Sequence, residues 1–173
     1  MNTDSQLDPL QSLMAYQEAC QRFDVEAAAA CFSDTGALEY AGGQLTGRAA
    51  LLEAHRWDRA ARNQVAFVEP RVNGDQVSLT FVNQHELHRI LGVEAIRSPA
   101  EMVIRDGRIH RLRILKPEPG SLQAMRDKSG PFFAWVRQHH AEAWQRTAVL
   151  DEAGGQALYD IAHAWRRHHQ AAA

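Results

Sequence analysis

The stretch AYQEACQRFDVEAAAACFSDTGALEY, residues 15–40, holds two helical patterns and the start of a strand. From residue 10 up to Phe23, apolar side chains recur at spacings of three and four, which is typical of a helix with one buried face. Asp24 breaks this run, and its carboxylate can accept hydrogen bonds from the free N–H groups of a following helix. The alternation in residues 37–40 then indicates a strand. The stretch therefore predicts a helical hairpin with a very short hinge, followed by a sheet.

The rest of the chain adds a third helix, a run of strands and a helical end. A helix is expected over residues 48–62, where apolar residues recur on one face. The period then changes to two, and NGD at 73–75 and DG at 106–107 are typical of hairpin turns. Strands are expected over residues 64–72, 76–88, 93–105 and 108–115, and helices over residues 131–150 and 152–169. This order predicts an α+β fold with a two-helix C-terminal extension.

Composition is that of a soluble globular protein. The 173 residues are 45% hydrophobic and 23% charged, a length and balance that suit one chain with a sizeable core. The formal net charge of −2 argues against a polyanionic partner such as nucleic acid. No run of roughly 18 apolar residues is present, so no membrane contact is expected, and the polar, acidic N-terminus predicts a cytoplasmic protein. Cys20 and Cys31 are expected to be reduced packing residues.

The order and spacing of these elements resemble the nuclear-transport-factor-2-like (NTF2-like) fold, which steroid delta-isomerase and the SnoaL-type polyketide cyclases share. The resemblance rests on the helical hairpin, on LTGRAALLE at 45–53 and on DGRIHRLRIL at 106–115. It implies a cone-shaped, strongly curved antiparallel sheet wrapped around the N-terminal helices, with a deep apolar pocket inside. We therefore expect an NTF2-like domain over residues 1–120 and a helical extension packed on it over residues 121–173.

The resemblance also implies roles for side chains in that pocket. Tyr16 aligns with the oxyanion-hole tyrosine of steroid delta-isomerase, and Glu101 aligns with that enzyme's second, protonated acid. Such an acid stays neutral and donates a hydrogen bond when an apolar site raises its pKa. His55 falls where a residue that supports the oxyanion tyrosine can lie. The residues expected to contact a substrate are Tyr40, His55, Trp57, Leu112 and Ile114.

The proton-transferring base is the part of the isomerase site that this sequence lacks. That enzyme's aspartate falls at Tyr40, and a phenol with a pKa near 10 is a poor base at pH 7. Two histidines are candidates for the role. His110 shares the cavity-facing side of the last strand with two aliphatic residues. His85 and His88, in HELH at 85–88, lie three apart on an expected strand and so point to opposite faces, which leaves open which of them faces the cavity.

The leading hypothesis is a cofactor-independent isomerase, dehydratase or cyclase that acts by proton transfer on a hydrophobic, oxygen-bearing small molecule. Tyr16 and Glu101 would stabilise charge on the oxygen, and His110 or His85 would move the proton. The alternative is a non-catalytic domain of the same fold that carries a hydrophobic ligand or binds another protein. Neither hypothesis calls for a metal or a cofactor. We expect a homodimer formed through the convex face of the sheet.

Overall fold

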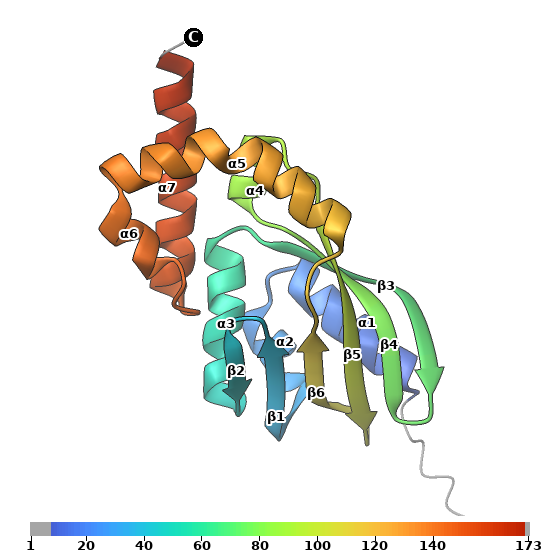
Figure 1. Cartoon of the computed structure of the whole chain (residues 1–173). Helices are drawn as coiled ribbons and strands as arrows, with labels where there is room; N and C mark the ends of the chain where they lie inside the picture. Colours follow the sequence, from blue (N-terminus) through green and yellow to red (C-terminus); the bar gives the residue numbers. More distant parts are fainter. Residues whose placement is uncertain (1–7, 172–173) are drawn as a thin grey trace, which may run out of the picture. The chain divides into compact units, whose positions relative to one another are not determined.

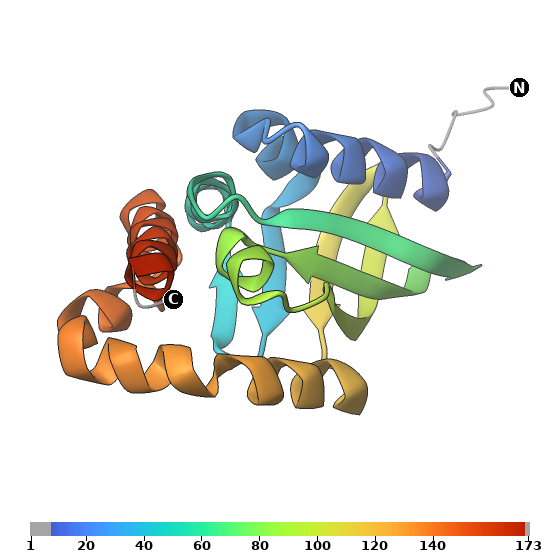
Figure 2. The ribbon, with the colours of Figure 1, turned by 90° about the horizontal axis from the view of Figure 1, so that it is seen from above.

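The computed structural model describes residues 8–171, which form an α+β fold. The helices are α1 (Pro9–Gln21), α2 (Val25–Ala30), α3 (Arg48–Ala60), α4 (Glu86–Leu91), α5 (Pro119–His139), α6 (Ala141–Arg146) and α7 (Glu152–Ala171). The strands are β1 (Phe32–Tyr40), β2 (Gly43–Thr46), β3 (Gln64–Asn73), β4 (Gln76–Gln84), β5 (Ile96–Arg105) and β6 (Arg108–Ile114). Figure 1 shows the strands side by side in one sheet, and Figure 2 shows α1 lying along one face of it.

The sheet is curved and unclosed, with the strand order β2-β1-β6-β5-β4-β3. β1 pairs antiparallel with β2, and β5 pairs antiparallel with β6, as the turn at residues 106–107 predicts. β1 and β6, in contrast, run parallel to each other. The expected curved α+β architecture is confirmed, and the β1–β6 pair departs from the antiparallel pairing that was expected.

The described chain divides into two compact units. The first, called the sheet unit below, contains the residues up to Leu52 together with Val65–Val82 and Ser98–Lys116. The second, called the helical unit, contains Glu53–Gln64, Asn83–Arg97 and the residues from Pro117 onward. The larger part of α3, the end of β4 and the start of β5 therefore contribute to the helical unit. This division differs from a boundary near residue 120, because a change of pattern along the chain does not show which segments pack together.

The core of the sheet unit joins the buried face of α1 to the inward face of the sheet. Leu13, Tyr16 and Cys20 lie three and four residues apart on α1, and all three are buried. The Tyr16 ring stacks on that of Phe67 and meets that of Phe32 edge-on, with ring centroids 5.3 Å apart in both pairs. Such aromatic pairs add about 0.5–1.5 kcal/mol each beyond the area they bury. Tyr16 is therefore a main packing residue of this core.

Aspartate side chains cap three of the described helices: Asp8 caps α1, Asp24 caps α2 and Asp151 caps α7. Asp24 Oδ1 accepts a hydrogen bond from the backbone N–H of Ala27 at the start of α2, over 3.1 Å. Asp151 Oδ1 accepts one from the N–H of Gly154 at the start of α7, over 2.8 Å. Each bond satisfies a donor that has no partner inside its own helix. The helical hairpin and its cap at Asp24 are thus confirmed.

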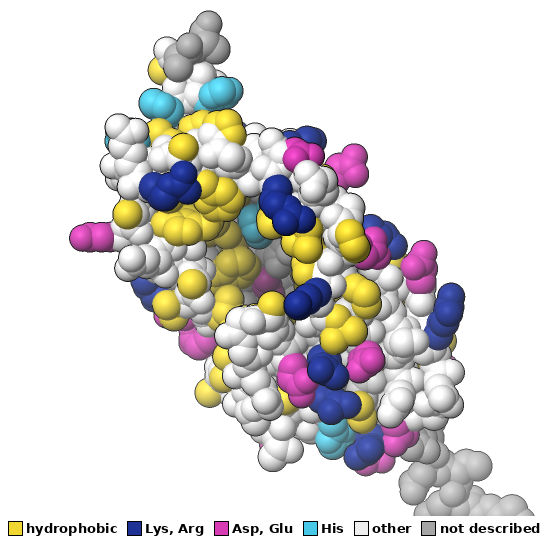
Figure 3. Space-filling view, viewed as in Figure 1, with side chains coloured by type: hydrophobic (Ala, Val, Ile, Leu, Met, Phe, Trp, Pro, Cys, Tyr) yellow, Lys and Arg dark blue, Asp and Glu magenta, His cyan; other side chains and the backbone are white. Residues whose placement is uncertain are grey.

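The helical unit is built around aromatic side chains of α5, α6 and α7. Phe132 is fully buried, and its ring meets those of Phe133, Trp144 and Trp165 edge-on, at centroid distances between 5.3 and 5.8 Å. Figure 3 shows hydrophobic side chains gathered around a hollow on one face of the molecule, with a histidine side chain inside it. The cluster of aromatic side chains around Phe132 gives the helical unit a core of its own.

The C-terminal extension has three helices where two were expected. α5 begins at Pro119 and contains Pro131, the residue expected to start it. Pro119 suits the first turn of α5, because the N–H that a proline lacks would have no partner there. This explains why α5 starts at Pro119 and not at Pro131. α6 follows as a separate short helix after His140. Within residues 8–171, none of the helices combines the length and the apolar character that a transmembrane helix needs.

Candidate functional site

Tyr16 and Glu101 do not meet in a common pocket. Tyr16 is 3% exposed in the core of the sheet unit. Glu101 is exposed on the opposite face of the sheet, because Ala100 and Met102 on either side of it take the inward positions. The expectation that Glu101 points into the cone is therefore wrong: the alternation of β5 runs one residue out of the expected register.

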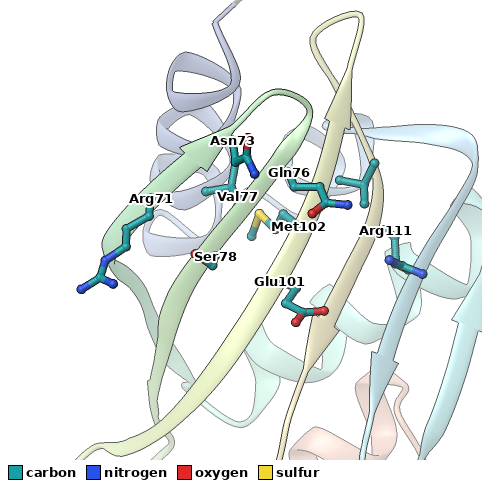
Figure 4. Close-up of a pocket in the computed structure, with 9 residues that line it drawn as sticks. Arg71, Asn73, Gln76, Val77, Ser78, Glu101, Met102 and Arg111 are labelled. Atoms are coloured by element: carbon teal, nitrogen blue, oxygen red, sulfur yellow. The ribbon is translucent and has the colours of Figure 1, made fainter.

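Glu101 instead lines a shallow polar cleft of about 210 Å³ on the outer face of the sheet. Figure 4 shows its carboxylate projecting from β5 on the side where Arg111 projects from β6, while Met102 turns to the other side. The structure therefore gives Glu101 no oxyanion-binding geometry.

His110 lies at a β-bulge, which removes it from the inward face of β6. Val103 pairs with Arg111 and Ile104 pairs with Ile109, so the residue between the two β6 partners has no counterpart on β5. Ile109 and Leu112 are both fully buried although they are three residues apart. The alternation that placed His110 in the cavity fails at this bulge.

The bulged His110 contacts β1 instead. It is half-buried, and its Nδ1 lies 3.4 Å from Ser33 Oγ. Leu112 lies in the core of the sheet unit, and Ile114 packs against that core from a half-buried position. These two side chains face inward as expected, and His110 does not.

Tyr40 and His55 each have local contacts of their own. Tyr40 is half-buried at the end of β1, and its ring lies so close to Gly42 that a Cβ there would be 2.5 Å from Tyr40 Cε2. His55 is buried in the helical unit, with Nδ1 3.6 Å from Asp58 Oδ2. A role for His55 toward Tyr16, which belongs to the sheet unit, stays a prediction.

The HELH segment forms the start of a helix and not the end of a strand. β4 ends at Gln84, His85 occupies the N-cap position, and α4 runs from Glu86 to Leu91. Gly92, in the left-handed conformation with φ 66°, ends the helix. Residues three apart in a helix lie on the same side, so the expectation that His85 and His88 point to opposite faces is wrong.

Tertiary hydrogen bonds explain why the strand stops there. The Gln84 side chain donates to the carbonyl oxygen of Val93 over 3.0 Å, which ties the two ends of α4 together. Arg89 donates to the carbonyl oxygens of Gln84, over 2.8 Å, and of Arg62, over 2.6 Å. The Glu86 N–H donates to the carbonyl oxygen of Ala61. Ala61 and Arg62 belong to the segment that follows α3, so the local pattern of residues 76–88 could not reveal these two contacts.

His85 and His88 stack ring on ring. Their centroids are 3.5 Å apart and their planes are inclined by 23°. His88 is 7% exposed. Burial, with the nearby Arg89 guanidinium, lowers the pKa of His88 to about 4, and burial, His88 and Arg89 together hold the pKa of His85 well below its usual range. Both imidazoles are therefore neutral at pH 7.

The stacked pair lines an apolar cavity of about 260 Å³ in the helical unit. The other lining residues are mostly aromatic or aliphatic: Trp57, Leu87, Leu91, Met125, Ser129, Phe133, Trp144, Thr147 and Leu158. Concave apolar sites with few polar groups are the usual form of small-molecule sites. Of the residues predicted to form a site, the structure brings His85 and Trp57 together here.

Most polar groups in this wall already have partners. Trp57 Nε1 donates to the carbonyl oxygen of Thr147 over 3.2 Å, and Thr147 Oγ1 donates to that of Trp144 over 2.7 Å. Ser129 Oγ donates to the carbonyl oxygen of Met125 over 2.6 Å. The Nδ1 atoms of His85 and His88 are buried and have no hydrogen-bond partner among residues 8–171. Among residues 8–171, these two nitrogens are therefore the side-chain polar atoms of the lining residues that are buried without a partner.

Sequence reasoning found His85 and Trp57 but missed the rest of this site. The strand expected over residues 76–88 puts His88 on the face opposite His85, and nothing in the sequence indicates that Phe133 and Trp144 line a site. One local signal was present: an acidic residue such as Glu86 is common in the first turn of a helix. The aromatic wall comes from segments far apart in the chain and had no such signal.

Comparison with known proteins identifies the fold. No protein-family model and no curated protein matches the sequence. An NTF2-like protein of unknown function from Cytophaga hutchinsonii is 12% identical, with 70% of this chain and 99% of that chain covered and a TM-score of 0.55. A protein with a ketosteroid isomerase-like fold from Catenulispora acidiphila is 19% identical, with 69% and 92% covered and a TM-score of 0.55.

A third solved structure, from Xanthomonas campestris and provisionally described as a polyketide cyclase, is 20% identical. The match covers 69% of this chain and 95% of that chain, with a TM-score of 0.52. Likeness at such identities establishes shape and not chemistry. The chain has the NTF2-like fold that its sequence predicts.

Proposed function

We propose that this NTF2-like chain binds a small hydrophobic molecule in the cavity of the helical unit. The observation that carries the proposal is the cavity itself: about 260 Å³ walled by aromatic and aliphatic side chains, with two neutral, stacked imidazoles in the wall. Each square ångström of apolar surface that a ligand buries there contributes about 25 cal/mol. The proposal corresponds to the non-catalytic alternative raised by the sequence, placed in a different part of the molecule.

The wall is suited to holding an apolar ligand without reorganising its own polar groups. The indole N–H of Trp57 and the hydroxyls of Ser129 and Thr147 are engaged by backbone carbonyls. Their apolar surfaces are therefore available to a ligand at no cost in broken hydrogen bonds. Preorganisation of this kind favours binding because little side-chain freedom is lost when the ligand enters.

The test is uptake of the uncharged dye N-phenyl-1-naphthylamine, followed by its fluorescence, by the whole chain and by a variant with a filled cavity. Leu91→Trp adds volume at a half-buried lining position and should weaken probe binding at least about tenfold. Val149→Trp is the matched control, because it introduces the same side chain in the same unit at a position that is 49% exposed. The Val149→Trp protein should bind the probe as the parent does. Equal binding by all three proteins would refute the proposal.

A second candidate function is proton-transfer catalysis of the isomerase, dehydratase or cyclase type. Two observations favour it: the ketosteroid isomerase-like and polyketide cyclase-like neighbours in fold, and His85 in a cavity wall. Against it, an imidazole whose pKa lies well below its usual range is a weak base at pH 7.

Tyr16→Phe tests the oxyanion role within this second candidate. The change removes one hydroxyl and keeps the ring that packs on Phe67, so folding should be little affected. If Tyr16 stabilises an oxyanion, turnover of an identified substrate should fall about 10²–10³-fold. Equal turnover by the two proteins would eliminate that role and leave the binding proposal untouched.

A further inference from the structure

We infer that the ligand of the helical-unit cavity is a small, uncharged aromatic molecule of one or two rings. This inference rests on the proposed binding function and specifies the chemistry of the bound molecule. The likeness in fold does not supply that chemistry, because likeness at such low identity establishes shape alone. It comes from the composition of the cavity wall and from the angles between its rings.

Aromatic rings make up a large part of the cavity wall. Five of the eleven lining residues carry one: Trp57, His85, His88, Phe133 and Trp144. Trp57, Phe133 and Trp144 are only half-buried and pack against the apolar cluster of the unit from its border. The chain therefore leaves part of these ring surfaces uncovered, and a ligand in the cavity covers them.

Two pairs of wall rings stand nearly perpendicular to each other. The planes of Phe133 and Trp144 meet at 77°, with ring centroids 5.4 Å apart, and those of Trp57 and His85 meet at 83°, with centroids 6.3 Å apart. A flat ring that lies parallel to one member of such a pair is nearly perpendicular to the other. It can therefore stack on one ring and meet the other edge-on, and both arrangements are favoured between aromatic rings.

A saturated ring of the same size lacks this second source of affinity. Aromatic rings carry a quadrupole, with a negative face and a positive edge, and favourable pairs contribute beyond the area that they bury. A saturated hydrocarbon has no such charge distribution and gains from burial alone. The wall therefore favours an aromatic ligand over an aliphatic one.

The volume of the cavity limits the size of the ligand. The cavity holds about 260 Å³. An apolar cavity of about 150 Å³ in another protein is large enough to bind benzene. By this measure the cavity of the helical unit accommodates one substituted ring or two fused rings.

The charge of the wall selects an uncharged molecule. Both imidazoles are neutral at pH 7, so none of the described side chains that line the cavity is charged. Cations are attracted to aromatic faces, but the charged side chain that acts on both imidazoles is the Arg89 guanidinium, which is itself positive. Burying an ammonium or a carboxylate in this wall without a partner is costly.

Toluene and methylcyclohexane test the inference, because they have nearly the same size and shape and differ in aromaticity. Their binding to the whole chain at pH 7 can be measured from the depletion of probe vapour above the protein solution. The two probes differ in hydration, so each association constant is divided by the partition coefficient of the probe from water into hexadecane. This quotient should be about two- to tenfold larger for toluene, the range of one aromatic pair.

Phe133→Leu connects the preference to the wall. The change removes one ring and keeps an apolar side chain at a half-buried position. The ratio of the toluene and methylcyclohexane association constants should fall about two- to tenfold relative to the parent, and the hydration of the probes cancels in this comparison. Tyr159→Leu is the matched control, because it removes a ring at a half-buried position of the same unit that does not line the cavity. It should keep the ratio of the parent.

The outcomes separate this inference from the proposed function. Equal quotients for the two probes in the parent, or an unchanged ratio in Phe133→Leu, would overturn the inference and leave apolar binding intact. Binding of neither probe would overturn both. If Phe133→Leu does not fold, the quotients measured on the parent decide.

Discussion

His85 and His88 lie face to face with ring centroids 3.5 Å apart, at the N-terminus of a short helix that follows a strand without a turn. The arrangement is stable only while both rings are neutral, since two imidazolium ions at this distance would repel each other strongly. It therefore connects the protonation of one short segment to the stability of the helical unit.

The first prediction is a loss of stability in mild acid. An unfolded histidine has a pKa near 6.5, whereas the pKa of folded His88 is about 4. Between these values the unfolded chain binds a proton that the folded chain does not, so the free energy of unfolding falls as the pH falls. His88 alone accounts for about 3 kcal/mol between pH 7 and pH 4, and above pH 7 its effect is flat. Urea unfolding at several pH values measures this dependence.

His88→Phe isolates the contribution of His88 from the titration of carboxylates. The variant should show a shallower dependence of unfolding free energy on pH between 4 and 6.5 than the parent, because it has one buried imidazole fewer. His169→Gln, a change at an exposed histidine of α7, should leave the dependence as it is in the parent. A parallel pH dependence in parent and His88→Phe would contradict the assignment.

A second prediction concerns two glycines in helices of the same unit. A Cβ on Gly155 of α7 would lie 2.4 Å from the carbonyl oxygen of Trp57 and 3.0 Å from Ala60 Cβ, so Gly155→Ala should destabilise the protein by about 1–3 kcal/mol. Gly120 of α5 is exposed with nothing within 4 Å, so Gly120→Ala should stabilise it by about 0.5–1 kcal/mol. Thermal unfolding of both variants checks the opposite signs, and a gain at Gly155 would show that α7 does not approach α3 so closely.

A third prediction follows from the aromatic cluster. Phe132 is fully buried against three other rings, so Phe132→Ala should lower the free energy of unfolding by about 3–5 kcal/mol. Denaturant titration provides the measurement. Val149→Ala, at a position that is 49% exposed, is the control and should change stability by less than about 0.5 kcal/mol. A small effect at Phe132 would mean that the cluster does not hold the unit together.

A fourth prediction tests the hinge between α1 and α2. Asp24→Ala removes the side-chain acceptor of the Ala27 N–H and should cost about 1 kcal/mol. Asp34→Ala, at an exposed position of β1, deletes the same carboxylate without touching a helix start. Equal stability of the two variants in denaturant titrations would argue against the cap.

The features that the sequence predicts correctly are those set by neighbouring residues. The apolar spacing of α1, the cap at Asp24 and the turn at residues 106–107 each follow from a few consecutive side chains, and each is found. Together with their order, they were sufficient to predict the NTF2-like fold.

The site was harder to predict because its residues are set by contacts between distant segments. The bulge at His110 shifts one strand face by one residue, and the register of β5 places Glu101 outside. The end of β4 depends on carbonyl oxygens near residues 61 and 93, which Glu86 and Gln84 reach only after the chain has folded. Alternation within a single strand contains no information about any of these contacts.

The helical unit is assembled from three separate segments of the chain, and this limits how it can be exchanged or removed. Its apolar cluster includes Ala61 and Leu87 from the two inner segments, besides the side chains of α5 and α7. A chain shortened to end at Lys116 would keep those two inner segments and expose the surface that the missing helices cover. The C-terminal region is therefore not a detachable appendage, and a chimera that grafts this pocket onto a relative must transplant all three segments together.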